Sequence, residues 1–122
     1  MKYAVLDTNF IISCVNKKIN FFNDLESMGL KTIIPIEVMG ELEHISVSGQ
    51  KKFQNAAKIA LLILKKNSFK EISLGMKNVD LGLIELANKD EDYIVATLDQ
   101  DIKNKIRNNK IIIKGSKKLE II

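Results

Sequence analysis

The chain has 122 residues, of which 46% are hydrophobic and 28% charged, and its 19 Lys and Arg against 15 Asp and Glu give a net charge of +4. The single cysteine excludes an internal disulfide, and no Cys/His pattern of a zinc site is present. No apolar run approaches the ~18 residues of a membrane span, and Asp7 comes too early for a signal-peptide core. We therefore expect one cytoplasmic domain over residues 1–122 that does not bind membranes.

The first half of the chain alternates between two kinds of hydrophobic pattern. Lys2–Leu6 is a short apolar run that predicts a buried strand, and Thr32–Ile34 is a second, β-branched one. Helical spacing of apolar residues covers Thr8–Val15, Ile19–Leu30 and Ile36–Ser46. This order predicts a strand, two helices, a strand and a helix.

The alternation continues in the second half. Lys51–Lys66 is the longest predicted helix, and Val79–Asn88 and Gln100–Asn108 are two further ones. Phe69–Ser73 and Tyr93–Leu98 have strand character.

The C-terminal segment completes the pattern with two more short apolar runs. Ile111–Ile113 predicts a last central strand, and Leu119–Ile122 a short edge strand. Strands alternating with helices indicate a parallel sheet covered on both faces. We therefore predict an α/β protein, a three-layer α/β/α domain around a central parallel sheet of about five strands. Such sheets bind ligands at the carboxyl ends of their strands.

Carboxylates occur at four of these strand exits. Asp7 follows the first strand directly, Glu41 lies in the helix after the second, and Asp80 opens the helix after the third. Asp99 follows the fourth strand, with Asp101 two residues later. Because parallel strands end at one edge of a sheet, we expect these acids to converge there.

Simpler roles exist for each acid taken alone. An aspartate at a helix start is often an N-cap, and this reading applies to Asp80 and Asp101 above all. Thr8 could cap the first helix in place of Asp7. Glu37 lies four residues before Glu41, on the same side of its helix, and is a rival for its role. The capping explanation does not predict that the acids converge.

Convergence has a chemical consequence. Two carboxylates about 4 Å apart repel by roughly 4 kcal/mol at an effective dielectric constant near 20. A cluster must therefore be partly protonated or neutralised by a cation, and oxygen ligands alone favour Mg²⁺ or Mn²⁺. Such ions activate water and orient phosphates, so an acidic site in a basic protein predicts a phosphodiesterase.

Four short motifs resemble those of PIN-domain nucleases, in the same order. They are Leu6–Asn9, the Glu41–Leu42 pair, Asp80 with its following apolar residues, and Ala96–Asp101. The resemblance is to compact archaeal-type PIN proteins, related to VapC toxins and to ribosomal-RNA-processing nucleases. It implies Mg²⁺ or Mn²⁺ as cofactor and RNA hydrolysis that leaves a 5′-phosphate and a 3′-hydroxyl.

The resemblance also assigns roles to individual residues. The catalytic and metal-binding acids would be Asp7, Glu41, Asp80 and Asp99. Asp101 would join the metal ligands or hold the metal's waters, and Asn9 and Thr97 would orient them by hydrogen bonds. One departure is Leu98, where the fourth motif more often has a small polar residue.

Basic residues follow the last acidic motif and are candidates for phosphate contacts. This set consists of Lys103, Lys105, Arg107 and Lys110. The alternative is that they form only a solvated surface, and none of them could specify a base sequence by itself.

Several functions remain open from the sequence. The leading interpretation is the toxin of a VapBC-like pair, which binds RNA and an antitoxin protein and forms a homodimer, with Phe10–Ile12 or Phe21–Phe22 as possible contacts. An rRNA-processing or RNA-decay nuclease is the first alternative, and a catalytically silent RNA- or protein-binding adaptor is the second. A phosphoacceptor receiver domain fits poorly, because it expects an acidic pair after the first strand.

Overall fold

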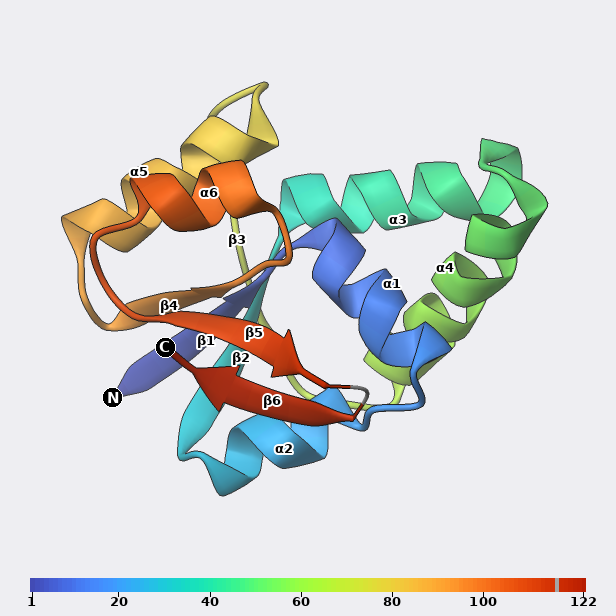
Figure 1. Ribbon diagram of the computed structural model, residues 1–122. Coiled ribbons are helices and arrows are strands. Elements are labelled where there is room, and N and C mark those ends of the chain that lie inside the picture. Colours follow the sequence, from blue (N-terminus) through green and yellow to red (C-terminus); the bar gives the residue numbers. More distant parts are fainter. Residues whose placement is uncertain (116) are drawn as a thin grey trace.

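A six-stranded sheet forms the centre of the computed structural model, which describes residues 1–115 and 117–122 (Figure 1). Its strands are β1 (Lys2–Leu6), β2 (Leu30–Pro35), β3 (Lys70–Ile72), β4 (Tyr93–Ala96), β5 (Lys110–Lys114) and β6 (Lys118–Ile121). They lie in the order β3-β2-β1-β4-β5-β6, with the first five parallel. The expected parallel sheet is confirmed. β5 lies between β4 and β6, and β6 adds an antiparallel edge, so the predicted last central strand and the predicted short edge strand are both present.

Helices cover both faces of this sheet. They are α1 (Thr8–Asn16), α2 (Phe21–Ser27), α3 (Ile36–Ser48), α4 (Lys51–Lys65), α5 (Val79–Lys89) and α6 (Gln100–Lys105). Figure 1 shows α5 and α6 together on one side of the sheet, and α1, α3 and α4 on the other. This is the predicted α/β/α arrangement. None of the helices in the described part of the chain is long and apolar enough to cross a membrane.

The alternation of side chains along β1 explains why both faces need cover. Ala4 and Leu6 pack into the larger core with α1 to α4, whereas Val5 packs into a second core with α5 and α6. All three side chains are fully buried. A strand that is apolar at every position is stable only between two helical layers.

α6 is shorter than its sequence pattern predicts. The expected helix over Gln100–Asn108 ends at Lys105, because the chain turns there toward β5. Side chains replace the lost helical hydrogen bonds: Asn88 accepts from the Arg107 backbone N–H, and Asn108 donates to the Ala87 carbonyl.

The suggested homodimer contacts at Phe10–Ile12 are wrong for this structure. Phe10 and Ile11 are fully buried and Ile12 is 4% exposed, so all three belong to the core. Phe21 is also buried, and Phe22 is partly buried against Phe21 and Phe69. α1 and α2 use these apolar residues to cover the sheet.

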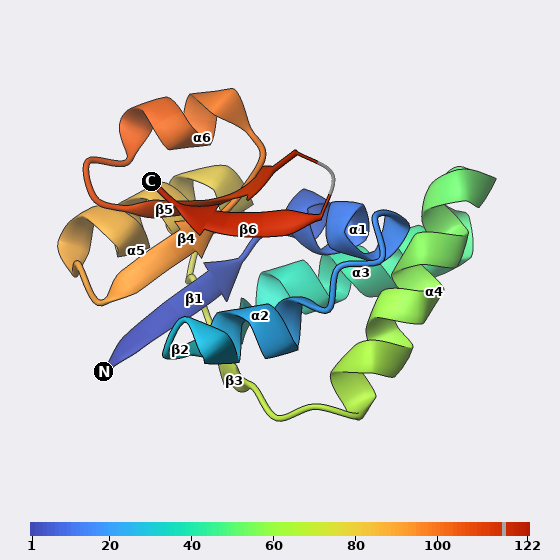
Figure 2. The ribbon, with the colours of Figure 1, turned by 60° about the horizontal axis from the view of Figure 1, so that its bottom comes forward.

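The sheet has its topological switch point between β1 and β4. From β1 the chain moves outward through β2 and β3, and then returns to the other side of β1 as β4. Leu6 pairs with Ala96 at the ends of these strands, so Asp7 and Thr97 leave the sheet side by side. β1 leads directly into α1 (Figure 2). Open α/β sheets bind ligands at such a point.

Burial makes the single cysteine chemically inert. Cys14 is fully buried in α1, and burial raises the pKa of its thiol to about 12. Because the thiolate is the reactive species, we expect the native protein at pH 8 to react with iodoacetamide at least tenfold more slowly than a small free thiol. Mass spectrometry of the alkylated protein measures this rate, with protein in guanidinium chloride as the fully reactive control. Equal rates in the two states would contradict the burial of Cys14.

Candidate active site

Asp7 lies at the centre of the candidate site, where β1 ends and α1 begins. Its Oδ1 accepts a hydrogen bond from the Thr8 backbone N–H at 2.8 Å, which makes it the N-cap of α1. Its Oδ2 accepts from the Thr97 hydroxyl at 2.9 Å. The residue is only 6% exposed. Asp7 is thus the cap that Thr8 was considered for, and it is also a buried carboxylate.

The surroundings of Asp7 disfavour its negative charge. Burial raises the pKa of its carboxyl above the usual value, although the hydrogen bonds from Thr97 and Thr8 oppose this shift. The charges of Asp80 and Glu41 raise the pKa further. The charges of residues after two other strands therefore act on Asp7.

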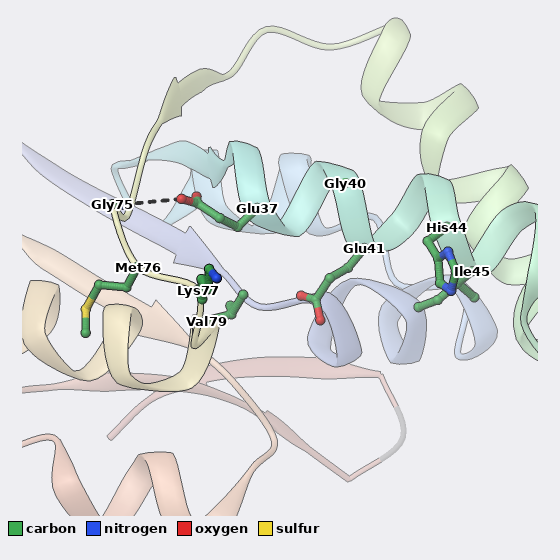
Figure 3. Close-up of a pocket in the computed structure, with 9 residues that line it drawn as sticks. All are labelled: Glu37, Gly40, Glu41, His44, Ile45, Gly75, Met76, Lys77 and Val79. Atoms are coloured by element: carbon green, nitrogen blue, oxygen red, sulfur yellow. Dashed lines mark hydrogen bonds between the residues drawn. The ribbon is translucent and has the colours of Figure 1, made fainter.

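Glu41 reaches Asp7 through a threonine. Its Oε1 accepts from the Thr8 hydroxyl at 2.7 Å, and the Thr8 backbone N–H donates to Asp7. Figure 3 shows the Glu41 side chain projecting from α3 toward α1, away from Glu37. Thr8 is buried, whereas the Glu41 side chain is exposed.

Glu37 has a different task. Its carboxylate accepts from the backbone N–H groups of Leu74 and Gly75, at 3.1 and 3.3 Å, and from the Ser73 hydroxyl at 3.4 Å. Desolvation raises the pKa of Glu37, but these hydrogen bonds outweigh it and hold the pKa below its usual value. Glu37 therefore ties the loop after β3 to α3, and Glu41 is the helix acid that faces Asp7.

Asp99 joins the network from β4. Its backbone N–H donates to the Thr97 hydroxyl at 3.1 Å, and that hydroxyl donates to Asp7. Its Oδ1 accepts from the Asp101 and Ile102 backbone N–H groups and so caps α6. Asp101 is exposed in the first turn of α6 and is not the cap. Hydrogen bonds thus connect Glu41, Thr8, Asp7, Thr97 and Asp99 in sequence.

Asp80 is not an N-cap. The cap of α5 is Asn78, whose Oδ1 accepts from the Leu81 backbone N–H at 3.1 Å. Asp80 lies exposed in the first turn of this helix, where the helix dipole favours a negative charge. Its carboxylate has no hydrogen-bond partner in the described part of the chain, so it is available for another ligand.

Among the described residues, no basic side chain forms an ion pair with these acids. Over residues 1–115 and 117–122 the one ion pair joins Lys114 to Glu120, on β5 and β6. In the same ranges no three carboxylate, histidine or cysteine side chains are close enough to hold a metal ion as they stand. Asp7, Glu41 and Asp99 instead direct one or more oxygens to hydrogen bonds within the protein.

A cleft of about 720 Å³ opens beside Glu41, between α3 and the loop that leads to α5 (Figure 3). His44 and Lys77 line it, as do Gly40 and Met76. No sequence motif predicts Lys77 in this region, and Thr8 was expected there only as a possible helix cap. Lys77 stands three residues before Asp80, and this proximity is the only signal that could have identified it.

The remaining predicted residues lie outside the hydrogen-bonded network. Asn9 is exposed on α1 and makes no side-chain hydrogen bond within the described residues. Lys103 and Lys105 are in the last turn of α6, and Arg107 follows next to Asn88 near the end of α5. Lys110 begins β5. Because α6 runs away from Asp99, the structure does not bring Lys105 and Arg107 together with the acids.

We expect Glu37→Gln to reduce stability at neutral pH, and to do so less in acid. A carboxylate whose folded pKa is lowered stabilises the protein above its unfolded pKa of about 4.3, and this contribution disappears as the pH falls through the folded value. Thermal melts between pH 7 and pH 3 should therefore converge for the wild type and Glu37→Gln. Glu43→Gln, exposed on the same helix, is the matched control. A difference in melting temperature that stays constant at every pH would contradict the stabilising contact between the Glu37 carboxylate and the loop after β3.

Asp7→Asn should raise the melting temperature of the metal-free protein by a few degrees. The amide keeps an acceptor for the Thr8 N–H, but it removes a buried charge and the repulsion from Asp80 and Glu41. Asp99→Asn is the control, because asparagine caps a helix as well as aspartate does and should change stability by less than about 0.5 kcal/mol. Calorimetry in EDTA measures both variants. A lower melting temperature for Asp7→Asn would contradict the claim that the surroundings of Asp7 disfavour its negative charge.

Comparisons with known proteins identify the family to which this fold belongs. A family model described as a PIN-like domain matches residues 4–115. Ribonuclease VapC4 of Methanocaldococcus jannaschii is 28% identical over 127 aligned residues, which cover 99% of this chain and 97% of that protein. The rRNA-processing protein fcf1 of Schizosaccharomyces pombe is 32% identical over 110 residues, which cover 86% of this chain but only 53% of that protein.

A solved structure of a PIN domain has the same fold as this chain. The PIN domain endonuclease Utp24 superposes with a TM-score of 0.78 at 26% identity, over 98% of this chain and 90% of that one. The family match spans most of the sequence and includes all four acidic motifs. The chain therefore belongs to the PIN-like domain family.

Proposed function

We propose that this protein is a metal-dependent endoribonuclease whose catalytic centre is built around Asp7. The observation that carries the proposal is the buried Asp7 carboxylate, which two hydroxyl-bearing residues connect to Glu41 and Asp99 and which Asp80 and Glu41 repel. A buried carboxylate with a raised pKa, in a cluster without basic partners, lowers the stability of the fold. Such groups are concentrated at functional sites, so its presence supports a functional role. Named nucleases among the relatives support the same conclusion.

The residues present fit a hard divalent cation. The donor set consists of carboxylate and hydroxyl oxygens, which Mg²⁺ and Mn²⁺ prefer. Asp7, Glu41, Asp80 and Asp99 would hold the ion, with Asp101 beside them. When bound, such an ion supplies charge neutralisation at the phosphate and a more acidic water. Asp80 is an exposed side chain and is free to turn toward it, whereas the hydrogen bond from Thr8 already fixes one oxygen of Glu41.

The protein's own groups would position these ligands. Thr97 is completely buried and holds one oxygen of Asp7 in place, while Thr8 holds Glu41 and the other Asp7 oxygen. Fixed carboxylates favour one orientation of the scissile phosphate, which reduces the entropy cost of the reaction. By resemblance to the family, we expect products with a 5′-phosphate and a 3′-hydroxyl.

We further propose that the protein is the toxin of a toxin–antitoxin pair, with an antitoxin as partner, a homodimer as its active form and the cytoplasm as its location. The relative named ribonuclease VapC4 supports this role, because the similarity extends over nearly the full length of both chains. A role in rRNA processing is the second candidate, and the similarity to fcf1 supports it.

We predict that the purified protein cleaves single-stranded RNA in Mg²⁺ or Mn²⁺ but not in EDTA. Asp7→Asn and Glu41→Gln should each lower the cleavage rate by at least 100-fold, because each removes a metal-binding charge. Thr97→Val should lower it by roughly 10–100-fold, as is typical when a group that orients a metal ligand is removed. Gel analysis of end-labelled RNA measures the rates and the product ends.

Glu37→Gln is the matched control for Glu41→Gln. Both changes remove one carboxylate from the same side of α3, but Glu37 contacts the loop after β3 and not Asp7. Its cleavage rate should remain within about threefold of the wild type at a temperature where both are folded. Equal loss in the two variants would argue against a specific role for Glu41. Full activity of Asp7→Asn would refute the proposed site.

A further inference from the structure

A second pocket lies at the opposite edge of the sheet from the acids. It has a volume of about 800 Å³ and is formed where β1, β2 and β3 begin, next to the ends of α2 and α4. The five parallel strands end at the candidate active site, so their starting ends face the other way. From Tyr3 to Asp7 the chain advances about 13 Å along β1. This pocket is therefore separate from the acidic site.

Aromatic rings and lysines both line this pocket. Tyr3, Phe22 and Phe69 are each partly exposed there. Lys31, Lys66 and Lys70 are exposed at its rim, and the ammonium of Lys70 lies 5.6 Å from the centre of the Tyr3 ring. We call this set of six residues the lysine–aromatic pocket.

The charge of the lysine–aromatic pocket is not balanced within the protein. Glu26 is the one acidic residue in its lining. Within residues 1–115 and 117–122, no carboxylate lies close enough to Lys31, Lys66 or Lys70 to form an ion pair. The pocket thus combines unpaired positive charge with exposed ring surface, whereas the site around Asp7 combines negative charge with hydroxyl groups.

We propose that the lysine–aromatic pocket binds a nucleotide of single-stranded RNA at a distance from the bond that is cut. Proteins hold single strands by stacking bases on aromatic side chains and by placing lysines along the phosphates, and both elements are present here. The pocket would anchor the RNA while another part of it reaches the carboxylates. A role of this pocket in RNA cleavage rests on the proposed nuclease function. The binding of RNA in the pocket does not depend on that function.

The competing explanation is purely structural. Both α2 and α4 end near this pocket, and lysines beside helix C-termini stabilise the helix dipole. The rings would then serve only to cover the core, since Phe22 and Phe69 also pack against it. This explanation predicts that changes in the pocket alter stability and leave RNA affinity unchanged.

The test is the binding of a fluorescein-labelled ten-residue oligouridylate to the full chain in EDTA, followed by anisotropy at several salt concentrations. We expect the double variant Lys31→Ala/Lys70→Ala to bind about tenfold more weakly, with a log–log salt slope shallower by roughly 1.4 for two lost phosphate contacts. Phe69→Leu keeps an apolar side chain but removes the ring, so affinity should fall about fivefold or more at an unchanged slope.

The control is Lys52→Ala/Lys58→Ala, which removes the same charge from exposed positions on α4 outside this pocket. It should bind within about twofold of the wild type. Thermal melts verify that all variants are folded at the assay temperature. Pocket variants that bind like this control would overturn the proposal, and so would equal affinity of the wild type for a duplex of the same length.

Cleavage in Mn²⁺ separates this proposal from the nuclease function. A wild type that cleaves RNA, with pocket variants that bind normally, rejects the anchor alone. A wild type that binds through the pocket but does not cleave rejects the nuclease function alone. A wild type that neither binds nor cleaves rejects both.

Discussion

The buried carboxylate of Asp7 is the constraint on which the site depends. A charged group at 6% exposure is costly unless it is hydrogen-bonded, and here one oxygen caps α1 while the other accepts from Thr97. These two hydrogen bonds fix the position of Asp7 at the switch point between β1 and β4. Burial, and to a smaller extent the charges of Asp80 and Glu41, raises the pKa of this carboxyl above its usual value. The negative charge that a metal ion would need at Asp7 therefore lowers the stability of the metal-free protein.

The sheet topology places the other acids near this point, without any structural element beyond those that build the core. Parallel pairing of β1 with β2 and β4 sends the following helices out from one edge, and aspartates cap two of them, α1 and α6. Thr8 and Thr97 are the small, buried residues that turn this proximity into a connected network, because each hydroxyl contacts an acid from a different strand exit or helix. The site is thus assembled by the same crossovers that build the core.

Much of this could be predicted from the sequence. The apolar run of β1 and the alternation of strands and helices predict the fold, and four acids at strand exits predict a convergent site. The capping roles were less predictable: Asn78 caps α5 in place of Asp80, because residues two apart can both satisfy the cap pattern. Glu37 and Glu41 have the same helical face, and only the position of the loop after β3, which no periodicity encodes, distinguishes them.

The sequence also did not predict which residues from distant parts of the chain lie close together in the fold. Lys105 and Arg107 follow the last acidic motif closely in sequence, yet α6 carries them away from it. The lysine–aromatic pocket has the opposite character: Tyr3, Lys31 and Phe69 are far apart in sequence and meet only because three parallel strands begin at one edge. Short-range patterns predict elements, but the strand order decides which residues share a surface.

The most direct test of the central claim is calorimetric titration of Mn²⁺ into the metal-free protein, its Asp7→Asn variant and its Glu37→Gln variant. The account predicts saturable binding to the wild type and to Glu37→Gln, and binding weakened by more than tenfold in Asp7→Asn. Equal affinity in all three proteins, or no binding to the wild type, would contradict a metal site built around Asp7.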